Sequence, residues 1–373
     1  MNTDVLWRLL PGLGQVTPGA LLMVAVGGLL IYLAVAKGFE PMLLLPIGAG
    51  AILANLPLSP LVEEHGLLRV LHEIGVSNEL FPLLIFIGIG AMTDFGPLLE
   101  NPKMFLLGAA GQFGIFGTLL LALLLGFDLN EAASIGIIGA IDGPTSIYVS
   151  NQLAPHLLGP IAVAAYSYMA LVPIIQPPIM RRLTSQRERQ IRMPYTQRTI
   201  SRRTRVLFPL LITVVVGLLV PMALPLVGTL MLGNLMRESQ VVERLAGAAS
   251  NELANIVTLF LGLAVGSTMQ AEAFLRIDTL FILALGILAF ALDTAAGLLF
   301  AKGLNLVSRV RLNPLLGAAG ISAFPMAARV AQRVVQEDDF ENFLLMHAMG
   351  ANTAGQIASA AAGGGVLALL GGG

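Results

Sequence analysis

The stretch Ile135–Ser150 sets a carboxylate in an otherwise apolar segment. It reads IGIIGAIDGPTSIYVS, and Asp142 is followed at once by Gly143 and Pro144, which interrupt a helix. A carboxylate inside a membrane is costly and is by default a functional group. An interrupted helix also frees backbone carbonyl groups that can bind an ion. We therefore expect an ion site here; the alternative is an Asp142 that is protonated or hydrogen-bonded to backbone.

A second interrupted segment follows in the other half of the chain. Residues 314–330 read PLLGAAGISAFPMAARV, with Ser322 just before Pro325, and the sequence GANTAG at 350–355 predicts a further interruption. A small hard cation such as Na⁺ prefers oxygen ligands. With no Cys and four scattered His, the chain gives no reason to expect a catalytic transition metal. The oxygen donors at or beside these interruptions are Asp142, Thr145, Ser146, Tyr168, Asn313, Ser322, Asn352 and Thr353.

Three further side chains, together with Tyr168, could carry chemistry, and each has a structural alternative. Asp94 could simply end a segment, and Asp293 could pair with a buried Arg or Lys. Tyr168, in AAYSYMALVP, could relay a proton or only pack. Arg329, in PMAARV, needs an anion at that depth, either an internal Asp or a substrate carboxylate.

The composition requires a membrane around these residues. The 373 residues are 56% hydrophobic and 12% charged, with a mean hydropathy of +0.83, which is too apolar for an average soluble domain. The 41 Gly and 21 Pro suit helices that pack closely or are broken. The sequence therefore predicts an all-α polytopic membrane protein.

The apolar segments and one basic loop give the expected topology. Residues 20–36 end in a small-x-small pattern that could be a cleavage site, but the run is long enough to be a first transmembrane helix. Nine of the 21 basic residues lie between Arg181 and Arg205, which predicts a cytoplasmic loop. Because aromatic residues are not interleaved, we expect no nucleic-acid binding. We expect spans at 39–56, 104–127, 157–179, 206–232 and 280–301, an interfacial helix at 57–79 and a re-entrant segment at 80–99.

The second half of the chain repeats the order of the first. Phe260-Leu-Gly-Leu-Ala resembles Phe86-Ile-Gly-Ile-Gly, and each precedes a full span and an interrupted helix. Paired interrupted segments indicate a transporter-like site at the bilayer midplane. We expect two related, inverted repeats, with scaffold helices in 1–79, a first repeat in 80–180, the Arg-rich loop in 181–205, a linking scaffold segment in 206–251 and a second repeat in 252–373.

Seven stretches, taken together, resemble the beta subunits of biotin-dependent sodium-ion-translocating decarboxylases. They cover nearly the whole chain and read KGFEPMLLLPIG, GIGAMTDFGPLLENP, GIIGAIDGPTSIY, AYSYMALVPIIQPPIMR, GNLMRESQVVERL, NPLLGAAGISAFPMAARV and NFLLMHAMGANTAGQI. The resemblance implies a subunit that decarboxylates carboxybiotin presented by a partner, takes up a proton and exports Na⁺. The complexes of this family act on oxaloacetate, methylmalonyl-CoA, glutaconyl-CoA or malonate.

The resemblance also implies roles for particular residues and an assembly. It places Na⁺ ligands at Asp142, Asn313, Gly317, Ser322 and Asn352. It links Tyr168 to the proton, and we expect Asp142, Tyr168 and Arg329 to take part in catalysis. It implies a homotrimer with an elevator-type core and scaffold, in a bacterial or archaeal inner membrane. Its partners would be carboxyltransferase, biotin-carrier and small gamma- or delta-type subunits.

Two departures from the family pattern bear on this prediction. Ile141 stands before the acid where a small residue is expected, and Ala351-Asn352-Thr353 replaces Pro-Asn-Val. The interval 57–79 is shorter than in oxaloacetate-specific members, which slightly favours an acyl-CoA or malonate complex. The alternative function is a secondary Na⁺-coupled organic-anion transporter, in which Arg329 would bind the solute.

Overall fold

A computed structural model describes residues 12–193, 200–308 and 311–371, and these residues form helices with no strand among them. The longer helices of the first half are α2 (Pro18–Lys37), α3 (Pro41–Asn55), α5 (Leu80–Met92), α7 (Met104–Ala110), α8 (Phe113–Leu124), α9 (Leu129–Gly136), α10 (Gly143–Leu153) and α11 (Leu158–Leu183). Those of the second half are α13 (Arg202–Leu219), α14 (Leu224–Ser239), α16 (Ala254–Ser267), α18 (Ile277–Val307), α20 (Met326–Asp338) and α21 (Leu345–Leu370).

Short helices and single turns connect these elements. They are η1 (Leu13–Gln15), α4 (Leu67–Leu71), η2 (His72–Ser77), α6 (Gly96–Glu100), η3 (Ile137–Ala140), η4 (Pro155–Leu157), α12 (Gln186–Arg189), η5 (Pro221–Ala223), α15 (Glu243–Ala248), η6 (Ala249–Leu253), α17 (Ala271–Phe274) and α19 (Leu315–Ala319). Two of them, η2 and η6, are π-helical turns that each lead into a longer helix, α5 and α16.

The part of the chain that the structure describes has five helices that could each cross a membrane by length and composition. They are Pro18–Lys37, Met104–Leu124, Glu243–Ser267, Ile277–Val307 and Leu345–Leu370. Two bent pairs raise the number to as many as seven: the α4–η2 segment with α5, at 65°, and Pro155–Met169 with Leu171–Leu183, at 64°. The predicted all-α polytopic membrane protein is confirmed.

Several predicted segments differ in their details. Residues 206–232 are not one span, because Pro221 starts a 3₁₀ turn that separates α13 from α14. The segment 80–99 contains α5 and then α6 after a short break. The predicted interfacial helix continues through η2 toward α5. The division expected between 251 and 252 falls inside the helix Glu243–Ser267.

The interruption predicted at 350–355 is wrong, because α21 is continuous over 26 residues. Its glycines serve close packing instead. A Cβ on Gly350 would lie 3.1 Å from Pro97 O, and one on Gly355 would collide with Gly320 O. Glycine in a membrane helix is tolerated where another backbone approaches closely. GANTAG therefore marks a contact and not a break.

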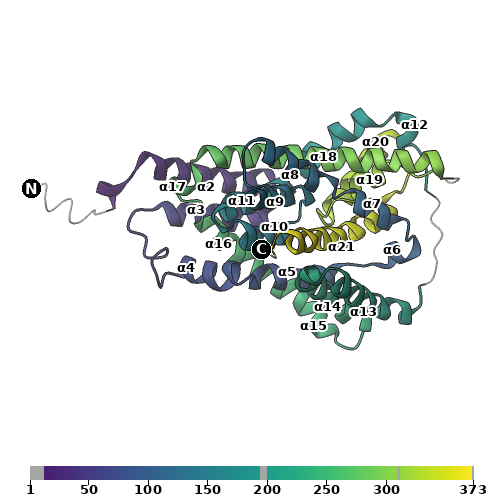
Figure 1. The fold of residues 1–373 in the computed structure, drawn as a ribbon, viewed down its shortest axis with the longest axis horizontal. Helices are drawn as coiled ribbons and strands as arrows, with labels where there is room; N and C mark the ends of the chain where they lie inside the picture. Colours follow the sequence, from purple (N-terminus) through teal and green to yellow (C-terminus); the bar gives the residue numbers. More distant parts are fainter. Residues whose placement is uncertain (1–11, 194–199, 309–310, 372–373) are drawn as a thin grey trace, which may run out of the picture.

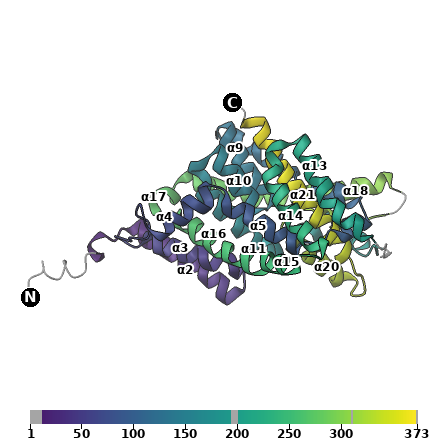
Figure 2. The ribbon, with the colours of Figure 1, turned by 90° about the horizontal axis from the view of Figure 1, so that it is seen from below.

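Six helices pack in a row in the order α2, α3, α16, α5, α14 and α13. The order is symmetric about the middle, because α2, α3 and α5 of the first half occupy the same places, counted from one end, as α13, α14 and α16 of the second half counted from the other. Figure 2 shows α3, α16 and α5 side by side in this row. A Cβ on Gly266 of α16 would collide with Ile47 O of α3, and one on Gly233 of α14 would collide with Ile87 O of α5. Each half of the chain thus packs its second long helix against the other half.

Helix α21 packs against α6, α7, α10, α14, α19, α20 and η5. A large hydrophobic cluster joins α7 to α11 with α18 to α21, and a second one joins α2, α3, α5, α11 and α16. Along the long axis of the molecule, α2 and α17 lie toward one end, and α12 and α20 lie toward the other (Figure 1). This arrangement places both interrupted segments, α9–α10 and α19–α20, in the interior of the larger cluster.

The close contact of α14 with α5 predicts a difference between two glycines of one helix. Gly233→Ala places a Cβ against the backbone of α5, and we expect it to destabilise the protein by about 1–3 kcal/mol through overpacking. Gly228→Ala meets only a Leu224 methyl at 3.7 Å and gains up to about 1 kcal/mol in helix propensity. Thermal unfolding of the purified chain in detergent measures both; equal melting temperatures would contradict the packing.

Candidate ion site at two facing helix breaks

The first break lies between η3 and α10, and Asp142 caps the helix that follows it. Ile141 adopts a left-handed conformation (φ +51°), which turns the chain, and Asp142 then takes the N-cap position of α10. This conformation is costly for a β-branched side chain, so complete burial must hold Ile141 in place. The sequence departure at Ile141 therefore falls on the turn itself.

Asp142 is buried, with 3% of its surface exposed, and its carboxylate accepts three hydrogen bonds. Oδ1 accepts from the Thr145 backbone N–H at 3.3 Å, and Oδ2 accepts from Thr145 Oγ1 at 2.8 Å and from Ser359 Oγ at 2.7 Å. Ser359 lies on α21, so a helix from the end of the chain completes the environment of this acid. Three donors on one carboxylate favour its ionised form.

The second break, Gly320–Pro325, separates α19 from α20 and is also held by α21. Asn352 Nδ2 donates to Ala319 O at 3.1 Å and to Ile321 O at 2.7 Å. Gln356 Nε2 donates to Ser322 O, and Ser322 Oγ donates to Gly355 O at 3.2 Å. The bonds from Asn352 and Gln356 satisfy carbonyl groups that the break leaves without a helical partner.

The two breaks touch each other. The backbone N–H of Ser322 donates to Ala140 O at 3.3 Å, which joins the second break to the end of η3, two residues before Asp142. The Phe324–Pro325 peptide bond at the far side of the second break is cis. The breaks predicted from sequence at Asp142 and within 313–325 therefore form one interior region.

Two amide oxygens in this region lack hydrogen-bond donors among the described residues. They are Asn352 Oδ1 and Gln356 Oε1, both buried, on side chains whose nitrogens hold the second break. A buried carbonyl oxygen without a donor is costly, and it can be compensated by a cation. Ser359 contacts both the Asp142 carboxylate and Gln356 O, which links the acid to these amides. The candidate ligands of a cation here are therefore all oxygen atoms, the kind of ligand that Na⁺ prefers. Within the described ranges no three His, Cys, Asp or Glu residues gather as a metal site.

Two predicted ligands lie away from the breaks. Asn313 is at the opposite end of α19, where its Nδ2 donates to Arg189 O at 2.8 Å and its Oδ1 accepts from Leu315 N at 3.1 Å. Gly317 faces α18, and a Cβ there would collide with Gly297 O. In this structure Asn313 anchors the Arg-rich loop, and Gly317 permits a close helix crossing.

Neither Tyr168 nor Arg329 contacts the Asp142 carboxylate in the described structure. Tyr168 Oη donates to Leu283 O of α18. The sequence suggested that a buried Arg329 would need an anionic partner. Arg329 is instead exposed on α20, so it does not need an internal Asp as its partner. The tyrosine beside the first break is Tyr166, whose ring leaves no room for a Cβ on Gly143 and whose hydroxyl is buried without a partner among the described residues.

Sequence reasoning missed Gln356 and Ser359 as members of the site. The available signal was their spacing from Asn352, because 352, 356 and 359 fall at i, i+4 and i+7 on one helix face. The expected interruption at 350–355 concealed this polar stripe. Both side chains are buried, and each contacts a different break.

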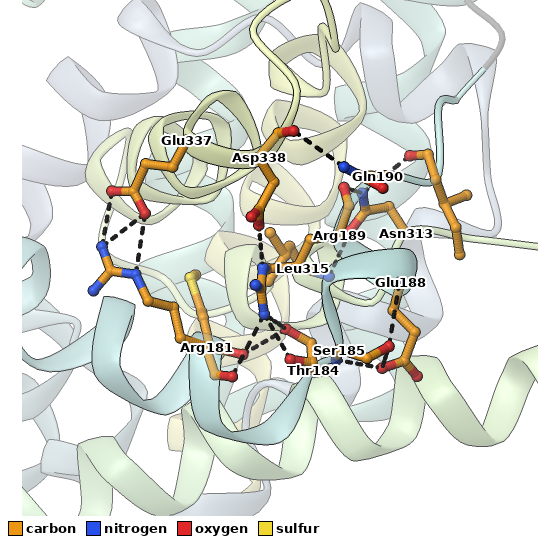
Figure 3. A network of polar contacts seen from close by, with 12 residues as sticks. Arg181, Thr184, Ser185, Glu188, Arg189, Gln190, Asn313, Leu315, Glu337 and Asp338 are labelled. Carbon is orange, nitrogen blue, oxygen red and sulfur yellow. Dashed lines mark hydrogen bonds and ion pairs between the residues drawn. The ribbon is translucent and has the colours of Figure 1, made fainter.

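The Arg-rich loop after α11 is fastened to the end of α20, as Figure 3 shows. Arg181 pairs with Glu337 at 2.8 Å, Arg189 with Asp338 at 2.5 Å and Arg192 with Asp339 at 2.8 Å. Because α20 leads directly out of the second break, these ion pairs fix the outer end of that interrupted helix. Arg198, part of the same predicted loop, lies outside the described residues.

These features define a polytopic α-helical membrane protein with an oxygen-lined site where two interrupted helices meet. Residues 19–370 match the family described as Na⁺-transporting oxaloacetate decarboxylase beta subunit, and the chain belongs to that family. The resemblance seen in the seven sequence stretches is therefore confirmed.

Relatives named for three different activities are similar to nearly the whole chain. The methylmalonyl-CoA decarboxylase beta subunit of Propionigenium modestum is 55% identical, covering 95% of both chains. The glutaconyl-CoA decarboxylase beta subunit of Acidaminococcus fermentans is 53% identical, covering 95% of this chain and 94% of its own. The oxaloacetate decarboxylase beta chain 2 of Salmonella typhimurium is 50% identical, covering 96% and 97%. Its alignment extends over 422 positions, against 378 and 356 for the other two, so it includes more inserted residues.

Removing the α21 hydroxyl that contacts the acid should weaken cation binding. Ser359→Ala deletes the 2.7 Å hydrogen bond to Asp142 Oδ2, and a bond to a charged group contributes about 1.5–3 kcal/mol. We expect Na⁺ affinity to fall roughly 10- to 100-fold by equilibrium binding to the purified chain. Ser150→Ala is the matched control, because its buried hydroxyl contacts only Ser146 O. Equal effects of the two variants would contradict the site.

The ion pairs between the Arg-rich loop and α20 predict how low pH loosens the C-terminal end of α20. The hydrogen bond from Arg192 lowers the pKa of Asp339 below its ordinary value of 3.8. Stabilisation by this pair is thus complete above pH 3.8 and is lost as the pH falls through the lower folded-state pKa. Hydrogen exchange at 336–344, corrected for intrinsic rates, should stay constant from pH 8 to about pH 5 and rise only below about pH 4.

A variant checks the same ion pair at neutral pH. Arg192→Gln should raise exchange at 336–344 by a small factor, since a solvent-exposed ion pair is screened by water and contributes little. Arg203→Gln, an exposed position on α13, should leave it unchanged. A release of wild-type protection already between pH 5 and 7 would contradict this role of Asp339.

Proposed function

We propose that this chain is the membrane subunit that decarboxylates carboxybiotin and couples that reaction to Na⁺ export, with uptake of a proton. The observation that carries the proposal is the contact of Asp142 with Ser359 between two helix breaks, beside the unpaired oxygens of Asn352 and Gln356. The names of the family and of the relatives supply the reaction class, a decarboxylation linked to sodium transport.

Ser359 gives the site a way to exchange a sodium ion for a proton. Its hydroxyl lies 2.7 Å from Asp142 Oδ2 and 3.0 Å from Gln356 O, so it can donate to either. With Na⁺ bound, the hydroxyl donates to the ionised carboxylate. When a proton reaches Asp142, the acid donates to Ser359 Oγ, and the hydroxyl turns to Gln356 O. The site then accommodates a neutral Asp142 and has lost the charge that holds Na⁺.

The energy for export would come from the decarboxylation. Moving one charge against 100 mV costs about 2.3 kcal/mol. The decarboxylation can supply this energy only if each turnover is tightly coupled to ion release, and protonation at the ion site itself would provide that coupling. Carboxybiotin would be presented by a biotin-carrier subunit, charged by a carboxyltransferase subunit. The chain itself binds biotin only transiently, and Na⁺ is its cargo. The acid whose carboxyl group is transferred is selected by the carboxyltransferase.

We also propose the assembly and the moving parts. The chain would form a homotrimer with a small gamma- or delta-type subunit, in a bacterial or archaeal inner membrane with the Arg-rich loop in the cytoplasm. Two inverted repeats would supply a core, drawn from 80–180 and 252–373, that slides in elevator fashion against scaffold helices from 1–79 and 206–251. The symmetric row of six helices supports the repeat and extends it to include α2–α3 and α13–α14.

Tyr168 and Arg329 keep a proposed place in the reaction. Tyr168 Oη donates to Leu283 O in the described state, so a role in proton transfer requires α11 and α18 to shift. Arg329 is exposed one turn after the second break, where it could meet an arriving carboxylate. The organic-anion transporter is the weaker hypothesis, because no described contact brings Arg329 into the oxygen-lined region.

Reconstitution with partner subunits tests the proposal. The chain is placed in liposomes with the biotin-carrier and carboxyltransferase subunits, and loss of carboxybiotin is followed with and without Na⁺. We expect Na⁺-dependent loss that falls at least 100-fold in Asp142→Asn, about the cost of removing a buried charged ligand. Asp278→Asn, which removes an exposed ion pair with Arg276, should retain full activity. Loss that ignores both Na⁺ and Asp142→Asn would refute the pump.

A further inference from the structure

A second buried carboxylate, Asp293, lies in the middle of α18 and takes no part in the site described above. Its side chain is completely buried. The backbone N–H of Gly114, in the first turn of α8, donates to Oδ1, while Oδ2 has no hydrogen-bond partner among the described residues. The hydroxyls of Thr118 and Thr294 are likewise buried and unpartnered there. Asp293 is thus a buried acid with one hydrogen bond and no counter-ion among the described residues, at a close contact between α8 and α18.

None of the helices around Asp293 brings a positive charge to it. α18 packs against α7, α8, α9, η3, α11 and α19, and four of these, α7, α8, η3 and α19, carry no titratable residue. The titratable groups of the other two and of α18 itself are Glu131, Tyr166, Tyr168, Arg181, Arg182, Asp278 and Lys302.

Most of these groups are engaged elsewhere. Lys302 binds Glu188, and Arg181 binds Glu337. Glu131 pairs with His156, and Asp278 with Arg276. Arg182 is exposed at the end of α11, and the hydroxyl of Tyr168 donates to Leu283 O. The pairing of Asp293 with a buried Arg or Lys, one alternative from sequence, is therefore wrong for the described chain.

We propose that Asp293 is a proton-binding site of the membrane interior. A proton from water adds to Oδ2 and converts the carboxylate to a neutral acid, while Oδ1 keeps the hydrogen bond from Gly114. Neutralisation is required because an ionised carboxylate with one hydrogen bond and no counter-ion is unfavourable in a buried position. A proton meets this requirement with the single free oxygen that the structure shows.

The position of Gly114 connects this site to both helix breaks. A Cβ on Gly139 of η3 would lie 3.0 Å from Gly114 C, and one on Gly111 would lie 2.6 Å from Gly320 O in the second break. The start of α8 therefore lies against the backbone that leads to Asp142 and against the break after α19. Whether Asp293 carries a proton therefore determines the charge where α8 meets the two helix breaks. The inference goes beyond the proposed function and does not depend on it.

Infrared spectroscopy of the purified chain in lipid tests the proton directly. With ¹³C-labelled aspartate, we expect at pH 7 an isotope-shifted carbonyl stretch of a protonated carboxylic acid. That band should persist in Asp142→Asn and in Thr294→Val, a neighbouring buried control, and should disappear in the double variant Asp142→Asn/Asp293→Asn. Because Asp142 and Asp293 are the two buried aspartates of the described chain, the band in Asp142→Asn decides the question even if the double variant fails to fold.

Three results would overturn the proposal. They are the absence of a protonated aspartate band in Asp142→Asn, its persistence in the double variant Asp142→Asn/Asp293→Asn, and its appearance only after Na⁺ is replaced by an organic cation. The last would make Asp293 a sodium ligand instead. The measurement uses neither carboxybiotin nor partner subunits, so a failure of the pump proposal would not affect it.

Discussion

The constraint on which this structure depends is that backbone polar groups inside a membrane must find partners within the protein. Two helices are interrupted in the interior, at Asp142 and at Gly320–Pro325, and each interruption frees groups that lipid cannot satisfy. A single face of α21 supplies partners: Asn352 and Gln356 bind backbone carbonyls of the second break, and Ser359 binds the Asp142 carboxylate at the first. The same side chains retain oxygens for a cation, so stabilisation of the fold and formation of the site are one arrangement.

Close backbone approach is what allows this arrangement to fit. Gly355 of α21 lies against Gly320 of the second break, and Gly139 lies against Gly114 of α8. Any side chain at these glycines would push apart the elements that share the site. The ion pairs between the Arg-rich loop and the end of α20 then hold the outer end of the second interrupted helix. The interior is thus assembled from three chain segments that are distant in sequence.

The sequence predicted the membrane class, the family and the break at Asp142, because Gly-Pro directly after an acid in an apolar run strongly disfavours a continuous helix. It could not separate the two uses of glycine: Gly350 and Gly355 suggested a break where α21 in fact passes through uninterrupted. Asn313 is expected in the site from the NPLLG motif of the family, and in this structure α19 separates it from Ser322. The continuity of α21 escaped the sequence because contact across helices is not encoded in local pattern.

The central claim is that the two breaks share one cation, and a double-mutant cycle on Na⁺ affinity tests it most directly. Thr145→Val alters the first break, and Gln356→Leu alters the second. If both side chains serve one ion, the free-energy losses will be non-additive by more than about 0.5 kcal/mol. Losses that add within that limit would mean that the breaks bind independently, which would contradict the account.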